Sequence, residues 1–186
     1  MPATILFDTV TLRHFACCRS LDILEQLCVA RSQPHWVEEV HAEVARIAAT
    51  QPRPPRAHCR YILAQKWLGD PHEVEMGDLH EIFSIRTALD LGLGGHPSEH
   101  LGEAQTIYFA EQLGAMFATD DGPAYDYAAQ RLGPANVIDS VELLRLAVSS
   151  RMVEADNAAE LAAQIQGAGR FFRKMHRTRL VAGDFQ

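Results

Sequence analysis

Acidic side chains directly follow two of the short apolar segments of the chain. The run ATILF at 3–7 ends at Asp8, and the run AMFAT at 115–119 ends at Asp120 and Asp121. Continuous apolar runs of this length are typical of buried strands in a parallel sheet. Because open α/β sheets bind ligands outside the carboxyl ends of their strands, these aspartates are predicted to lie at a ligand-binding edge.

Further acids lie on two predicted helices. Glu103 stands near the start of a helix predicted from Leu101 to about Gly114. Glu39 and Glu43 are four residues apart on another predicted helix, and therefore share a face. Carboxylates gathered at one site repel one another unless a cation neutralises them, and Mg²⁺ and Mn²⁺ prefer oxygen ligands. Convergence of the acids would thus imply a divalent metal that polarises a phosphoryl oxygen and acidifies a coordinated water.

The elements that must position these acids alternate along the chain. Strands are predicted at 3–7, 27–30, 115–119 and 135–138, and helical patterns at 57–68, 78–91, 101–114, 123–132 and 140–150. Such alternation favours a parallel sheet with helices on both faces. We therefore expect an α/β protein, a three-layer α/β/α sandwich with a central parallel sheet, plus a C-terminal helical extension.

The last part of the chain is predicted to be an amphipathic, basic helix from about Ala158 to Met175. We divide the chain into a domain at 1–150 and an extension at 151–186, packed on the domain or extending from it. The basic side chains that are candidates for RNA binding are Arg170, Arg173, Lys174 and Arg177. A helix packed on the domain with a solvated charged face is slightly favoured over an RNA-binding arm, and docking of a partner is a third alternative.

Composition limits the class of protein. The chain has 186 residues, 47% of them hydrophobic, which is enough for one sizeable core. It has no apolar run long enough to span a membrane and no signal-peptide pattern, so we expect a cytoplasmic protein without a membrane partner. Its four cysteines lack the spacing of a zinc site, and we expect reduced, mostly buried thiols. The formal charge of −7 is unusual for a nucleic-acid-binding protein, although the distribution of charge matters more than the sum.

Three segments together resemble the core motifs of PIN domains. They are ILFDTVTLRHF at 5–15, HLGEAQTIYFAEQLG at 100–114 and FATDDGPAYDYAAQRLG at 117–133. The resemblance covers about the first 150 residues and rests on the order and spacing of the motifs. It implies a PIN-like fold and a metal-dependent endoribonuclease that uses Mg²⁺ or Mn²⁺ to hydrolyse RNA, leaving a 5′ phosphate and a 3′ hydroxyl. The family includes VapC-like toxins of bacterial toxin–antitoxin pairs.

The resemblance also assigns roles to residues. It places the catalytic acids at Asp8, Glu43, Glu103 and Asp121, the metal ligands at Asp8, Glu103, Asp120 and Asp121, and supporting roles at Thr9, Thr119 and Glu39. Glu43 fits the second acid best, with Glu39 in the same pattern one turn earlier. Thr9 would hydrogen-bond Asp8 or a metal-bound water. An antitoxin would be expected to insert an Arg or Lys among the acids, and members of the family often form homodimers.

Other interpretations of the same residues remain open. An aspartate after a strand commonly caps a helix, and an acid in a first turn is stabilised by the helix dipole. Some PIN domains are catalytically weak scaffolds or RNA-binding modules. DNA cleavage of the flap-nuclease type shares the metal chemistry, but such enzymes carry more acids and DNA-gripping elements than this sequence shows.

Overall fold

The computed structural model of the protein describes residues 4–28, 34–90, 100–169, 172–173, 176 and 180–185. Within these residues the chain forms a mixed α/β structure with a three-stranded parallel sheet. The strands are β1 (Ile5–Phe7), β2 (Met116–Ala118) and β3 (Val137–Ile138), in the order β1-β2-β3. Phe7 lies opposite Ala118, so β1 and β2 end side by side.

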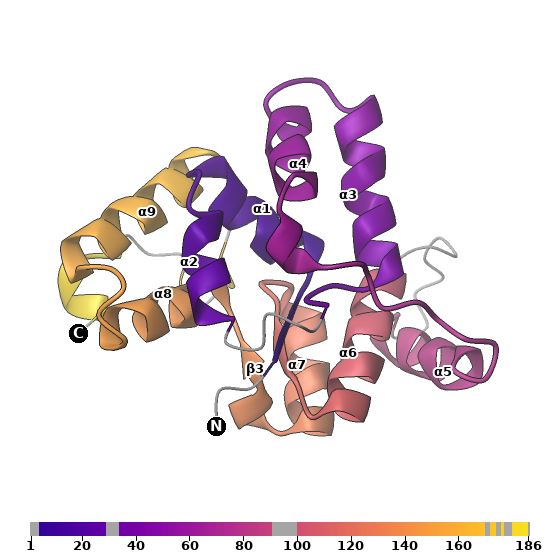
Figure 1. Cartoon of the computed structure of the whole chain (residues 1–186). Coiled ribbons are helices and arrows are strands. Elements are labelled where there is room, and N and C mark those ends of the chain that lie inside the picture. The colour runs from indigo at the N-terminus through magenta and orange to yellow at the C-terminus, as the bar shows by residue number, and fades with distance from the viewer. Residues whose placement is uncertain are drawn as a thin grey trace.

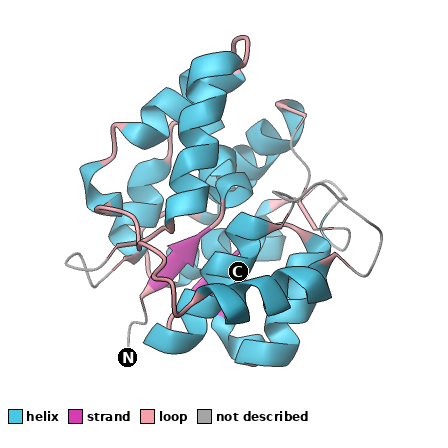
Figure 2. Cartoon of the chain, turned by 90° about the vertical axis from the view of Figure 1, so that its right-hand side faces the viewer, coloured by secondary structure: helices cyan, strands magenta, loops and turns pink. Residues whose placement is uncertain are grey.

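Helices cover both faces of this sheet (Figures 1 and 2). Their bounds are α1 (Thr9–Cys17), α2 (Leu21–Leu27), α3 (Glu38–Thr50), α4 (Pro55–Leu63), α5 (Leu79–Leu89), α6 (Leu101–Leu113), α7 (Gly122–Leu132), α8 (Ser140–Ser149) and α9 (Ala155–Gly167). Short 3₁₀ turns lie at Lys66–Leu68, Pro134–Asn136 and Ala182–Phe185.

The alternation of side chains along the strands divides the core into two apolar clusters. Ile5 and Phe7 belong to the cluster that contains the buried faces of α1, α2, α3, α4, α8 and α9. Leu6 and Phe117 belong to the other cluster, with α5, α6 and α7. Successive residues of a strand point to opposite faces, so three-residue strands are enough to separate two helical layers. The arrangement is compatible with the expected three-layer order.

Local chemistry explains where several helices begin and end. Asp8, Asp121 and Asp139 each accept a backbone N–H at the start of α1, α7 and α8. Asp139 forms a capping box with Glu142. Gly114 has a φ of +60° and ends α6 in the left-handed conformation that glycine adopts without strain.

Three expected elements differ from the structure. The strand expected at 27–30 is wrong at Leu27, which is the last residue of α2, and residues 29 and 30 lie outside the described part. The single helical pattern at 57–68 is divided into α4 and the 3₁₀ turn. The helix expected from Ala158 to Met175 ends at Gly167, because Gly169 takes a left-handed φ of +73°.

The C-terminal part packs on the rest of the protein. Ala158, Ala162 and Ile165 of α9 are fully buried in the same cluster as α1, and Phe172 packs edge-on against His14 with ring centroids 5.6 Å apart. None of the four cysteines forms a disulfide; two are buried and two half-buried. Among the described helices, none combines the length and apolar character needed to cross a membrane.

Candidate functional site

An aspartate follows each strand of the sheet, at the same edge. Asp8 follows β1, Asp139 follows β3, and Asp120 lies two residues after β2. All three side chains are at least 94% buried, with exposures of 3%, 0% and 6% respectively. Parallel strands that end side by side have therefore brought Asp8 and Asp120 together, as the sequence predicts. Asp139 was not among the predicted site residues, although the run that precedes it gives the same signal.

Asp8 is a buried carboxyl group held by two hydrogen bonds. One oxygen accepts the backbone N–H of Thr11 at 2.6 Å, and the other accepts the hydroxyl of Thr119 at 2.5 Å. Burial raises its pKa to about 7, the two hydrogen bonds oppose this rise, and the charge of Asp120 adds to it. Asp8 is thus both the cap of α1 and a carboxyl group poised between its charged and neutral forms near neutral pH.

Four further acids come from two helices and the loop after β2: Glu39 and Glu43 from α3, Glu103 from α6 and Asp121 from the loop. The pKa of Glu103 is raised to about 7, first by burial and then, against a backbone hydrogen bond, by the nearby carboxylates of Asp121, Glu43 and Glu39. Burial and the charge of Glu43 also raise the pKa of Glu39. These charge effects require Asp121, Glu43 and Glu39 to lie near Glu103, so the predicted acids of α3, α6 and the β2–α7 connection converge. We call Glu39, Glu43, Glu103 and Asp121 the outer acids.

A glutamine and a glycine hold α3 against α6. The buried side chain of Gln105 accepts the backbone N–H of Glu39 at 3.1 Å. A Cβ on Gly102 would lie 3.4 Å from the side chain of Val40, so the two helices approach closely at that point. Gln105 fixes the positions of the outer acids of α3 relative to Glu103. Sequence reasoning missed this residue, and its signal was a polar side chain on the apolar face of the helix.

The threonines support the acids, with one change from expectation. Thr119 hydrogen-bonds Asp8 and also accepts the backbone N–H of Asp121 at 3.1 Å. The hydroxyl of Thr9 donates to Glu43 at 2.6 Å. The hydroxyl of Thr9 thus joins α1 to α3 instead of bonding Asp8, and the alternative of a bond to a metal-bound water stays a prediction. Asp121 caps α7 by accepting the N–H of Ala124 at 2.8 Å.

Asp120 is occupied by protein partners. One oxygen lies 3.1 Å from His14 Nδ1 and accepts the hydroxyl of Ser140 at 2.5 Å, and the side chains of Asp120 and His14 are fully buried. Thr11 makes a longer contact of 3.4 Å with the same oxygen. A carboxylate already bonded in this way has little capacity left for a metal ion. Of the two aspartates, Asp121 is the one left half-exposed among the outer acids.

Arg173, predicted as an RNA contact, lies in a buried ion pair. Its Nε donates to Asp139 at 2.8 Å, its guanidinium lies 3.3 Å from the centre of the Tyr125 ring, and its side chain is 11% exposed. His176 Nε2 lies 3.1 Å from the same Asp139 oxygen. Arg173 therefore anchors the C-terminal segment instead of presenting a free charge. The other three candidates, Arg170, Lys174 and Arg177, lie outside the described residues.

The outer acids and Asp8 supply only oxygen ligands, the donor type that Mg²⁺ and Mn²⁺ prefer. No described Lys or Arg forms a salt bridge with the outer acids, although the charge of Arg46 acts on Glu39 without one. Within those residues, however, no three His, Cys, Asp or Glu side chains are already arranged to hold a metal ion. The residues present fit a hard cation by chemistry and charge, and binding would draw the carboxylates closer together.

Comparison with protein-family models, with curated proteins and with solved structures found no match.

Proposed function

We propose that this protein is a metal-dependent endoribonuclease with a PIN-like fold that hydrolyses RNA phosphodiester bonds. The observation that carries the proposal is the convergence of Asp8 and the outer acids at the carboxyl edge of a parallel sheet. After burial, the charges of acids from α3 and the β2–α7 connection raise the pKa of Glu103, and Thr119 links Asp8 to the backbone of Asp121. Such an arrangement is unfavourable to the bare protein, and a bound cation would make it favourable.

Asp8, Glu103 and Asp121 are the residues that would hold the ion, with Glu43 beside them. When bound, Mg²⁺ or Mn²⁺ would polarise a phosphoryl oxygen and acidify water for attack. Thr119 orients Asp8, and Thr9 orients Glu43, through their hydroxyl hydrogen bonds. Gln105 keeps α3 and α6 in register, so that the carboxylates stay together. Asp120 would contribute through packing and charge, because one of its oxygens is bonded to His14 and Ser140 and the other lies 3.4 Å from the backbone nitrogen of Ser140.

The test is a cleavage assay on labelled single-stranded RNA and the matching DNA, with Mn²⁺, with Mg²⁺ and with EDTA. Asp8→Asn and Glu103→Gln each remove one ionisable group from the site. Asp156→Asn and Glu160→Gln, at exposed positions of α9, are matched controls. We expect metal-dependent cleavage of RNA by the wild type and both controls, and at least a hundredfold loss in both site variants. Cleavage that persists in EDTA, or in both site variants, would contradict the proposal.

A second candidate function is a catalytically weak PIN-like scaffold or RNA-binding module. The observation in its favour is that no three described side chains are already arranged as a metal site, and that Asp120 is fully engaged. Calorimetric titration with Mn²⁺ separates the two candidates. Metal binding that is lost in Glu103→Gln favours the nuclease, whereas no metal binding together with RNA binding favours the scaffold.

We also propose that the protein acts as the toxin of a toxin–antitoxin pair. The outer acids would attract an Arg or Lys of an antitoxin, since a cationic side chain competes with the metal for the same carboxylates. A partner of this kind would inhibit cleavage and be displaced by excess Mn²⁺.

A further inference from the structure

The charges of the chain are strongly segregated along the sequence. Residues 44–69 contain five Lys or Arg and no Asp or Glu, and residues 70–81 contain five Asp or Glu and no Lys or Arg. The basic members of the first segment are Arg46, Arg53, Arg56, Arg60 and Lys66. A protein with a net charge of −7 therefore has a continuous basic segment directly followed by an acidic one.

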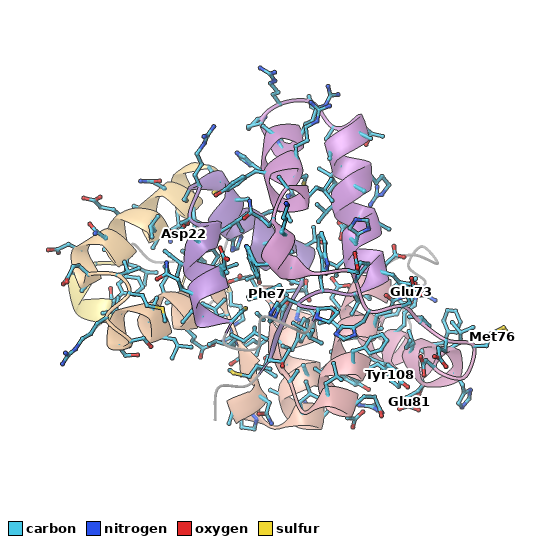
Figure 3. All side chains as sticks on the ribbon, in the orientation of Figure 1. Phe7, Asp22, Glu73, Met76, Glu81 and Tyr108 are labelled. Atoms are coloured by element: carbon cyan, nitrogen blue, oxygen red, sulfur yellow. The ribbon has the colours of Figure 1, made fainter. Side chains whose placement is uncertain are left out.

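The basic segment forms a helical hairpin that projects from the body of the molecule. Helices α3 and α4 stand side by side and rise above the rest of the chain (Figure 1). Ile47, Cys59 and Ile62 are buried where the two helices pack. The basic side chains point outward: four of the five are exposed, and Arg56 is half-buried. Nitrogen-tipped side chains gather at the tip of the hairpin, far from Glu73 and Glu81 by α5 (Figure 3).

The same hairpin carries two of the outer acids. Glu39, Glu43 and Arg46 are spaced i, i+4 and i+7, so they share one face of α3. The charge of Arg46 is close enough to Glu39 to oppose the rise of its pKa that burial and Glu43 cause. At a rise of about 1.5 Å per residue, Arg46 lies about one helical turn beyond Glu43. One face of α3 therefore passes directly from the acids to the basic end of the hairpin.

Helix α1 adds basic groups at the base of the hairpin. Arg13 lies one turn after Thr9, whose hydroxyl contacts α3, and its Nε is buried without a hydrogen-bond partner among the described residues. At the end of α1, Arg19 and Tyr61 of α4 line a cavity of about 210 Å³. The Arg13 side chain is only half-buried as a whole, so its guanidinium adds positive charge at the base of the hairpin.

We propose that the α3–α4 hairpin, together with the adjoining face of α1, binds the phosphodiester backbone of single-stranded RNA and delivers it to the acids. The inference rests on the proposed function, because it takes RNA as the substrate. A polyanion is repelled by a cluster of carboxylates, so its affinity must come from a separate basic surface. The hairpin supplies that surface within one turn of the acidic site.

The test compares two charge-reversed variants by fluorescence anisotropy, with labelled single-stranded RNA and the matching DNA in EDTA. Arg46→Glu with Arg60→Glu alters the hairpin. Arg145→Glu with Arg151→Glu alters exposed arginines of α8 and the turn after it, with the same change in net charge. We expect the hairpin variant to lose at least tenfold in RNA affinity, and the control less than threefold. If Arg→Glu variants fail to fold, Arg46→Gln with Arg60→Gln replaces them, and the salt dependence of log K should weaken by about 0.7 per lost contact.

Equal losses in both variants, no loss in the hairpin variant, or binding of DNA but not RNA would each overturn the inference. Because EDTA prevents metal-dependent cleavage, binding is measured apart from catalysis. RNA binding through the hairpin without cleavage in Mn²⁺ would refute the proposed nuclease and leave this inference standing. If the protein cleaves RNA in Mn²⁺ equally well with the hairpin charges reversed, the proposed nuclease stands and this inference is refuted.

Discussion

At the scale of single residues, two neighbouring aspartates have different surroundings. Asp120 is buried against His14 and Ser140, whereas Asp121 is half-exposed among the outer acids and caps α7. Both have the sequence context of a metal ligand. Only the side chains around them separate a carboxylate that is bonded within the protein from one that is free to bind an ion.

This difference predicts opposite effects of substitution. Asp120→Ala removes the buried partner of His14 and Ser140 and should lower the free energy of unfolding by about 1–3 kcal/mol, the cost of leaving buried polar groups without a partner. Asp121→Asn keeps a good capping residue, so stability should change by less than about 1 kcal/mol while metal affinity falls. Urea unfolding and calorimetric titration with Mn²⁺ measure the two effects. Equal loss of stability in both variants would show that the assignment of the aspartates is wrong.

At the scale of elements, the C-terminal segment is tied to the sheet edge through one buried carboxylate. Asp139 caps α8 and accepts from both Arg173 and His176, and Arg173 also stacks on Tyr125 of α7. The end of the chain is thus connected to β3, α7 and α8 at a point next to the candidate site. We infer that the extension stabilises the sheet edge instead of acting as an independent arm.

Arg173→Ala should therefore destabilise the whole protein. The substitution leaves Asp139 buried with His176 and its capping contacts, and a cost of about 3–5 kcal/mol is typical for breaking such a pair. Arg151→Ala, at an exposed position, is the control and should change stability by less than about 0.5 kcal/mol. Thermal unfolding measures the loss of stability of the whole protein, and the rate of proteolysis after residue 167 measures how firmly the C-terminal segment is held. An Arg173→Ala protein as stable as the control would mean that the ion pair contributes nothing.

At the scale of the whole molecule, the buried carboxyl groups of the acidic site oppose folding at neutral pH. Asp8 and Glu103 have folded-state pKa values of about 7, raised from 3.8 and 4.5. In the unfolded chain these carboxyl groups lose their protons first, so rising pH favours the unfolded state between about pH 4 and pH 7. The candidate active site thus makes the metal-free protein less stable at neutral pH than at mildly acidic pH.

We expect the melting temperature in EDTA to fall between pH 5 and pH 7.5 because of these two groups, and to fall less in Asp8→Asn. For Asp8 the full effect, from below pH 4 to above pH 7, can reach about 4 kcal/mol, since one pKa unit corresponds to about 1.4 kcal/mol; between pH 5 and pH 7.5 it is about 2.5 kcal/mol. At pH 7.5, Mn²⁺ at about 100 times its Kd should restore about 2.7 kcal/mol in the wild type and little in Asp8→Asn. Differential scanning fluorimetry measures both. If the melting temperatures of the wild type and Asp8→Asn depend on pH to the same extent, the assignment of this effect to Asp8 is wrong.

The sequence alone was sufficient to predict the features that depend on local interactions. Apolar runs ending in aspartate predicted the positions of β1 and β2, and helical periodicity placed α6, α7 and α8 within a residue or two. Because parallel strands end at one edge, the same runs predicted that Asp8 and the acids after β2 would meet. The strand expected at 27–30 shows the limit of such predictions. A short apolar run has the same sequence pattern in a strand as at the end of a helix, and Leu27 is the last residue of α2.

Only the tertiary structure decided which partner each polar side chain takes. Thr9 contacts Glu43, 34 residues away, and Asp120 is bonded by Ser140, 20 residues away. Arg173 lies in a basic tail, but it forms an ion pair with Asp139, which was not among the predicted site residues. A side chain's hydrogen bonds depend on what the fold brings within about 3 Å of it, and spacing along the chain carries no information about contacts between separate elements.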